Sequence, residues 1–108
     1  MRIVFVTIPP EAAPGFLRQL VEERLVAGGN IIPGVRSFYH WKGQVCDEPE
    51  AVLLMETADD RVAAMMERIQ QIHPYEVPKI LTFEPREGLE AYLHWVETET
   101  RVGGTPER

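Results

Sequence analysis

Apolar residues along the chain follow two different periods. Residues 2–8 form a short run rich in Ile, Val and Phe that stops at Pro9-Pro10, which is typical of a strand. Over residues 11–27 apolar side chains recur every three or four positions with mostly charged residues between them, so this segment predicts an amphipathic helix. We expect Gly28-Gly29 to end that helix, because glycine accepts the left-handed conformation common just past a helix C-terminus.

The following segment predicts a β-hairpin. A turn or bulge signal at Pro33-Gly34 separates Ile31-Ile32 from a strand over residues 35–41, and Lys42-Gly43 is the expected hairpin turn. The chain returns over residues 44–57 with a continuously apolar centre, which is typical of a buried strand.

Alternation along the first hairpin strand separates its side chains onto two faces. One face carries Val35, Ser37, Tyr39 and Trp41, and the other carries Arg36, Phe38 and His40. Because both faces hold aromatic residues, we expect the hairpin to pack on two surfaces, one of which belongs to another chain. Pro49 in the returning strand marks a bulge or an edge segment.

The last part of the chain predicts a helix, a strand and a final helix. Thr57 with Asp60 has the form of a capping box, and the helix that follows should end near His73 because Pro74 disfavours helical geometry there. A strand is predicted from Val77 to Phe83. A helix is predicted over residues 88–100, with four side chains directed inward: Leu89, Tyr92, Leu93 and Val96.

This order of elements is the split βαβ of ferredoxin-like domains. We predict an α+β fold, a βαββαβ sandwich with an extra C-terminal helix, in which one antiparallel sheet carries its helices on one face. Residues 1–100 form a single domain in this interpretation, and residues 101–108, which hold a Gly-Gly-Thr-Pro sequence, form a disordered tail.

Composition narrows the classes of partner. Eleven Lys and Arg against seventeen Asp and Glu give a net charge of -6, which is the wrong sign for attraction to a phosphate backbone, so no nucleic acid is expected. No apolar run approaches the roughly 18 residues of a membrane helix, and the N-terminus has no cleavage-like site, so we expect a cytoplasmic protein. The single Cys46 excludes an internal disulfide.

The familiar catalytic and nucleotide-binding motifs do not occur, so an enzyme is not expected. The densest cluster of chemistry is His73-Pro-Tyr-Glu-Val-Pro78, whose two prolines fix the backbone. His73 could bind a transition metal or move protons, Glu76 could complete the site, and Tyr75 could hydrogen-bond a ligand. The structural alternative is a rigid turn in which His73 caps the second helix and Tyr75 packs.

Other polar and aromatic groups have simpler structural interpretations. His40 could line a site, but the strand around it is more typical of an interface or core strand, and Trp95 on the last helix is a packing anchor beside a solvated His94. Cys46 is either a soft metal ligand or an incidental thiol. Three acidic residues of the hairpin are interpreted as a solvated loop: Asp47, Glu48 and Glu50.

Several short motifs run in one order from Ile3 to about Val96. They are Val21-Glu-Glu-Arg-Leu25, Asn30-Ile-Ile-Pro-Gly-Val35, Tyr39 with Trp41 and Gly43, His73-Pro-Tyr-Glu-Val-Pro78, and Gly88 with Tyr92, Leu93 and Trp95. In these motifs the sequence resembles the divalent-cation tolerance (CutA) family. The resemblance implies a ferredoxin-like subunit in a tight homotrimer similar to the PII-type signalling proteins, and an association with copper and other divalent cations.

The resemblance also implies particular residue roles. Sites near subunit clefts would involve His73, Tyr75 and Trp41, and we add Asn30 to the cleft residues. The residues expected at the trimer interface are Phe38, Tyr39, Trp41 and Trp95. Two positions depart from the family pattern: Gly28 stands where a cysteine is usual, which argues against a thiolate copper site, and Glu56 stands where a lysine is common.

Two functions follow as expectations. The first is a trimeric, cytoplasmic protein that binds or responds to divalent metal ions such as Cu(II), with His73 as the principal ligand, helped by Glu76 or by groups across the subunit boundary. The second is a PII-like signalling module that binds a small molecule or a partner protein at inter-subunit clefts.

Overall fold

The structure, a computed structural model, describes residues 1–101, so most of the predicted tail lies outside the described residues. Its elements are β1 (Arg2–Ile8), a 3-10 turn (Pro10–Ala12), α1 (Ala13–Glu22), β2 (Gly28–Trp41), β3 (Gln44–Thr57), a second 3-10 turn (Asp59–Arg61), α2 (Val62–Ile72), β4 (Ile80–Phe83) and α3 (Glu90–Glu99). None of the helices in this part of the chain has the length and apolar character needed to cross a bilayer.

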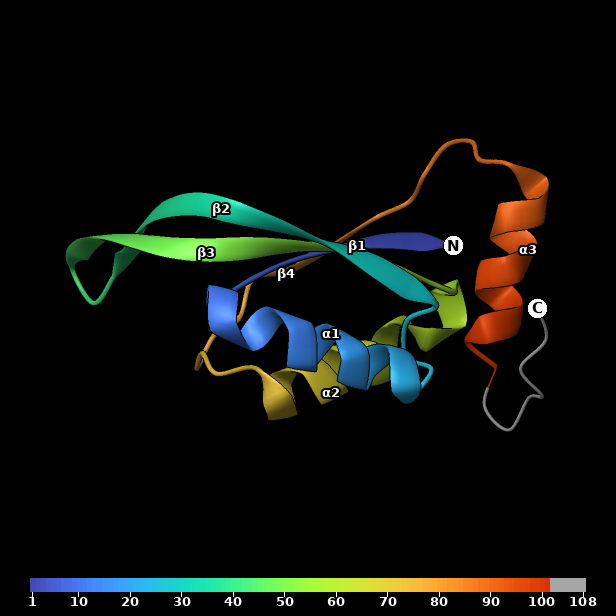
Figure 1. The fold of residues 1–108 in the computed structure, drawn as a ribbon, viewed down its shortest axis with the longest axis horizontal. Helices are drawn as coiled ribbons and strands as arrows, with labels where there is room; N and C mark the ends of the chain where they lie inside the picture. The colour runs from blue at the N-terminus through green and yellow to red at the C-terminus, as the bar shows by residue number, and fades with distance from the viewer. Residues whose placement is uncertain (102–108) are drawn as a thin grey trace.

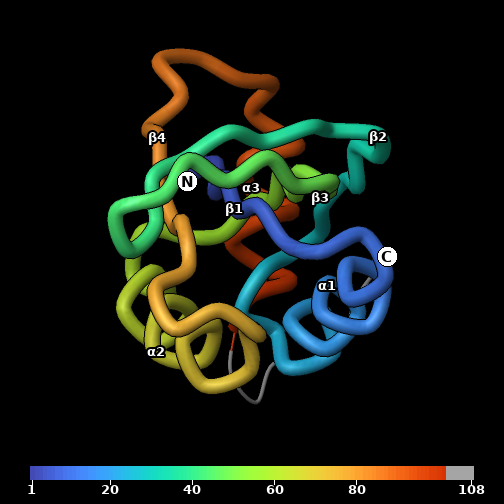
Figure 2. The backbone as a smooth tube through the Cα atoms, turned by 90° about the vertical axis from the view of Figure 1, so that its left-hand side faces the viewer, coloured from blue at the N-terminus to red at the C-terminus, as the bar shows by residue number. Residues whose placement is uncertain are grey.

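The four strands form one sheet in the order β2-β3-β1-β4, and every neighbouring pair is antiparallel. Helices α1 and α2 cover one face of the sheet, while α3 stands at the end opposite the hairpin tip (Figure 1). Viewed from the hairpin end, α1 and α2 lie side by side beneath the strands (Figure 2). The predicted ferredoxin-like α+β fold with an extra C-terminal helix is confirmed.

The core lies between the sheet and the two helices. Alternation along β1 sends Val4, Val6 and Ile8 toward the helices, and all three side chains are fully buried. They pack with residues of β3, α1 and α2 that belong to the same buried cluster: Leu53, Met55, Phe16, Leu20, Met65 and Ile69. Met55 of β3 and Met65 of α2 are therefore fully buried core residues.

The β2–β3 hairpin extends well beyond the rest of the sheet. Strand β1 ends with Ile8 opposite Ala51, so β3 before that point pairs with β2 alone. We call this two-stranded extension, residues 35–50, the arm. It begins at an irregularity in the register between Ile32 and Val35, which confirms the bulge signal there. The arm stretches the molecule to 46 Å, and its radius of gyration is 14.6 Å against about 13 Å for a compact chain of this length.

The predicted end of the first helix is wrong. Helix α1 stops at Glu22, Arg24 takes the left-handed conformation with φ 58°, and Gly28 and Gly29 belong to β2. The glycine at position 29 serves a close approach of strands, since a Cβ there would lie 2.8 Å from the Cγ of Met55. The glycine pair therefore allows close packing of β2 against its neighbours and does not end a helix.

Other predicted boundaries are also corrected. Thr57 does not cap α2: it is the buried last residue of β3, and its hydroxyl donates to the carbonyl of Leu25 at 2.7 Å. Strand β4 begins at Ile80 and not at Val77, because residues 77–79 do not pair with β1. Helix α3 begins after Leu89, which is 75% exposed and does not point inward, whereas Val96 is buried as predicted.

Candidate functional site

A cleft of about 570 Å³ lies where the arm leaves the body of the protein. We call it the arm cleft. It is formed by the arm, the end of β1 and the segment between α2 and β4. Its lining residues are Thr7, Ser37, Phe38, Tyr39, Trp41, Glu50, Pro74, Tyr75, Glu76, Val77 and Lys79. The His-Pro-Tyr-Glu segment and the aromatic hairpin, which are far apart in the sequence, thus meet at one site.

His73 fixes the backbone of the two cleft residues Thr7 and Tyr75. It is the C-cap residue of α2 and is 6% exposed. One ring nitrogen, Nε2, lies 2.8 Å from the carbonyl oxygen of Thr7, and the other, Nδ1, lies 3.0 Å from the backbone nitrogen of Tyr75. A carbonyl only accepts and an amide N–H only donates, so Nε2 carries the proton and Nδ1 accepts. Burial lowers the pKa of His73, which favours this neutral form.

These two hydrogen bonds bear on the predicted metal site. Glu76 lines the arm cleft, but His73 uses both ring nitrogens within the protein. To bind a metal ion, the imidazole would have to release the carbonyl of Thr7 or the amide of Tyr75. Within residues 1–101, no three His, Cys, Asp or Glu side chains are grouped so that they could hold a metal. The His73 and Glu76 site stays a prediction.

Glu50 is the residue that sequence reasoning missed. It was expected in a solvated loop, yet it is 3% exposed and accepts a hydrogen bond of 2.7 Å from the hydroxyl of Tyr75. Burial, followed by the hydrogen bond to Glu50, raises the pKa of Tyr75 well above its usual range, so the phenol remains a donor. One signal could have found Glu50: it directly precedes the apolar run of β3, where the hairpin meets the body.

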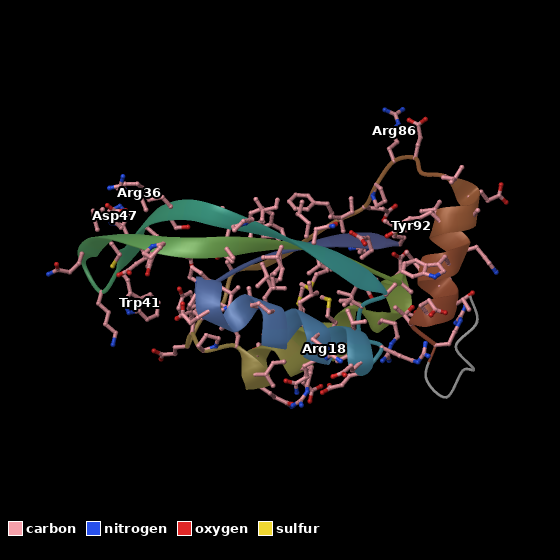
Figure 3. All side chains as sticks on the ribbon, viewed as in Figure 1. Arg18, Arg36, Trp41, Asp47, Arg86 and Tyr92 are labelled. Carbon is pink, nitrogen blue, oxygen red and sulfur yellow. The ribbon has the colours of Figure 1, made fainter. Side chains whose placement is uncertain are left out.

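The two faces of the arm have different environments. Trp41 and Arg36 lie on opposite sides of the ribbon, and Arg36 is close to Asp47 (Figure 3). Arg36 makes a bidentate pair with the carboxylate of Asp47 at 2.8 and 2.9 Å and lies 5.3 Å from the ring centre of Phe38. The predicted alternation is thus confirmed, and Asp47 is the surface residue it was expected to be. The opposite face presents Tyr39 and Trp41 to the arm cleft, which Phe38 also lines.

Asn30, a predicted cleft residue, and Trp95, a predicted interface residue and packing anchor, both lie away from the arm cleft. Asn30 pairs with Leu54 within the sheet and does not line the arm cleft. Trp95 stacks on Tyr92 with ring centres 5.4 Å apart, and its ring lies 3.6 Å from where a Cβ of Gly28 would be. The position at which the family usually has a cysteine is therefore covered by an indole ring, far along β2 from the arm.

A second tyrosine–carboxylate pair lies near that indole. The hydroxyl of Tyr92 donates to Glu56 at 2.8 Å. Burial raises the pKa of Glu56, and burial together with the carboxylate raises the pKa of Tyr92 to about 12. Unlike the Tyr75–Glu50 pair, whose carboxylate is buried, this pair is partly exposed, and it does not line the arm cleft. It is therefore a natural internal comparison for the pair in the cleft.

Comparison with known proteins places these features in a family. The family described as "CutA1 divalent ion tolerance protein" matches residues 2–99. The divalent-cation tolerance protein CutA of Thermus thermophilus is 39% identical over 91% of this chain and 96% of its own length. The mouse protein CutA is 38% identical over 89% of this chain, but the match spans only 55% of the mouse protein.

Solved structures agree. The Thermus thermophilus divalent cation tolerance protein superposes with a TM-score of 0.88, covering 94% of this chain and 100% of that one. A Nostoc protein described as PII-like protein CutA, in its apo form, superposes with a TM-score of 0.89 at 38% identity, over 94% of this chain and 98% of that one.

Proposed function

The chain belongs to the family of CutA1 divalent ion tolerance proteins, and we propose that it acts as a PII-like homotrimeric binding module, not as an enzyme, whose arm cleft takes up a small organic molecule. We place this activity in the cytoplasm, where a lone free thiol such as Cys46 stays reduced. The observation that carries the proposal is the construction of the arm cleft.

The arm cleft has the properties of a prepared binding site. A volume of about 570 Å³ lies within the range of small-molecule sites, roughly 300–1,000 Å³. Four of its lining side chains are aromatic, and two of its polar groups are held in place: the backbone amide of Tyr75 donates to His73, and the Tyr75 hydroxyl donates to the carboxylate of Glu50. Side chains locked by second contacts are what a specific site requires. A purely structural turn does not need a carboxylate buried beside an open cleft.

The homotrimer is supported by apolar surface that a monomer would leave in water. Ile32, Leu81 and Phe83 lie on the sheet face that α1 and α2 do not cover, and Phe83 is 52% exposed. The arm adds the exposed Phe38, Tyr39 and Trp41, which remain our proposed interface residues together with Trp95. In such an assembly a neighbouring copy would close the open side of the arm cleft.

A second candidate function is the binding of a divalent metal ion such as Cu(II). Two observations favour it: the family is described by divalent ion tolerance, and two carboxylates, Glu50 and Glu76, line the same cleft. His73 would join them after giving up one of its hydrogen bonds, and copper would be preferred by the general affinity order.

A thermal-shift screen of metabolites on metal-stripped protein tests the first function. We expect at least one organic compound to raise the melting temperature of the wild type and to lose that effect in Tyr75→Phe. Tyr92→Phe is the matched control, because it removes the same hydroxyl from the second tyrosine–carboxylate pair, and it should respond like the wild type. If no compound binds, or if both variants respond equally, the arm cleft is not the site.

Copper titration of the same protein tests the second function. If His73 binds the ion, the electron paramagnetic resonance spectrum of bound Cu(II) should show coupling to an imidazole nitrogen, and that coupling should disappear in His73→Gln. A spectrum with oxygen ligands alone, unchanged by His73→Gln, would remove His73 from the site.

A further inference from the structure

We infer that the ligand of the arm cleft is an organic cation, a small molecule that carries a protonated amine or a quaternary ammonium group. This inference rests on the proposed small-molecule function and names the class of molecule. It follows from the kinds of group that line the cleft and from where the charges lie among them.

The first observation is the pairing of aromatic walls with carboxylates. Tyr39 and Trp41 reach the cleft from the arm, and Tyr75 reaches it from the opposite segment. Rings attract cations to their faces, and the attraction grows when the cation leaves water. The arm already shows this contact, since the ammonium of Lys42 lies 5.9 Å from the ring centre of Trp41.

The second observation is that a carboxylate is available at the base of the cleft. Tyr75 donates to Oε2 of Glu50, and within residues 1–101 no donor is hydrogen-bonded to Oε1. Glu76, in the segment between α2 and β4, adds a second acidic group to the cleft lining. A cation between these carboxylates would gain charge-assisted contacts, whereas an anion would meet two like charges.

Among residues 1–101, one basic side chain lines the cleft, and it already contacts an aromatic ring. The ammonium of Lys79 lies 5.0 Å from the ring centre of Phe5, on the sheet face that α1 and α2 leave uncovered. The acidic groups that line the cleft therefore outnumber the basic one, in a protein whose net charge is -6. A bare metal ion would use the carboxylates but not the rings, so an organic cation matches more of the lining.

Three ligands of nearly equal shape test this inference by isothermal titration of the assembled protein. Choline carries the positive charge, tert-butylethanol replaces the trimethylammonium group with a neutral one, and the anion of tert-butylacetic acid carries a negative charge. We expect choline to bind at least tenfold more tightly than the neutral alcohol and the anion to bind most weakly. Rising salt should weaken choline binding and leave the alcohol unchanged.

Variants locate the effect. Glu50→Gln keeps an acceptor for Tyr75 and removes the charge, and Glu76→Gln changes an exposed residue that cannot disturb the core. Each should lower the preference for choline over the alcohol at least threefold, whereas Glu90→Gln on α3 should leave it unchanged. Equal affinities for the three ligands, a preference for the anion, or no binding of choline would overturn the inference. A hit from the metabolite screen that is neutral or anionic would then leave the binding function standing without it.

Discussion

Removing the hydroxyl of Tyr75 should destabilise the protein by isolating a buried charge. In the wild type that hydroxyl donates to Glu50 at 2.7 Å, and Glu50 is 3% exposed. A hydrogen bond to a charged group contributes about 1.5–3 kcal/mol, and a carboxylate that loses its donor keeps the cost of its burial. We therefore expect Tyr75→Phe to lower the free energy of unfolding by about 2 kcal/mol.

Urea denaturation at fixed protomer concentration measures this loss, since an oligomer's stability depends on concentration. Tyr92→Phe is again the control: its partner Glu56 is partly exposed and can be solvated by water, so we expect a smaller loss, about 1 kcal/mol. In Tyr75→Phe, the further change Glu50→Gln should restore part of the stability, because a neutral amide is less costly to bury than a charge. Equal losses in the two single variants, or no recovery in the double variant, would refute this reasoning.

Alkaline pH gives a second readout of the same bond. Burial and Glu50 raise the pKa of Tyr75 above its ordinary value of 10. A raised pKa stabilises the fold fully below the unfolded value and loses that contribution as pH rises through the folded value. The wild type should therefore lose stability above about pH 10, and Tyr75→Phe should lose less over the same range. Parallel pH curves would contradict this.

Three further predictions concern the fold and the assembly. Because burial lowers the pKa of His73, metal-free protein should lose stability as pH falls below 6.5, and His73→Gln should flatten this dependence in pH-resolved denaturation. Gly29→Ala should cost about 1–3 kcal/mol in a denaturation experiment, since its Cβ would lie 2.8 Å from a side-chain atom of Met55, whereas Gly15→Ala meets nothing within 4 Å and should be neutral or stabilising. Trp41→Ala should weaken the trimer in size-exclusion chromatography with light scattering, and a monodisperse wild-type monomer would contradict the proposed assembly.

Periodicity was enough to predict the fold but not every boundary. The buried alternation of β1 and the helical spacing of α1 and α2 are local properties, so the order of elements follows from the sequence. The errors fall where a distant contact decides. Position 29 requires a glycine because the side chain of Met55 approaches it closely. The hydroxyl of Thr57 donates to the carbonyl of Leu25 and does not cap the helix that follows.

The candidate site could be predicted only in part for the same reason. The prolines around Tyr75 mark a rigid segment, and the aromatic strand stands out in the sequence. One cleft brings together Tyr75, Trp41 and Glu50 because the β2–β3 hairpin continues beyond the end of β1 at Ile8. No local sequence pattern encodes the length of that extension. Glu50 belongs to an acidic stretch whose other members, Asp47 and Glu48, are exposed. Glu50 is buried only because the folded chain brings it against the body of the protein.

A crystal structure of the protein with the most stabilising compound from the metal-free screen tests the central claim most directly. We predict electron density for that compound in the arm cleft, against Trp41 and Tyr75 and within hydrogen-bond distance of Glu50. Density at another place, such as the surface around Trp95, with an empty arm cleft would contradict the proposed function.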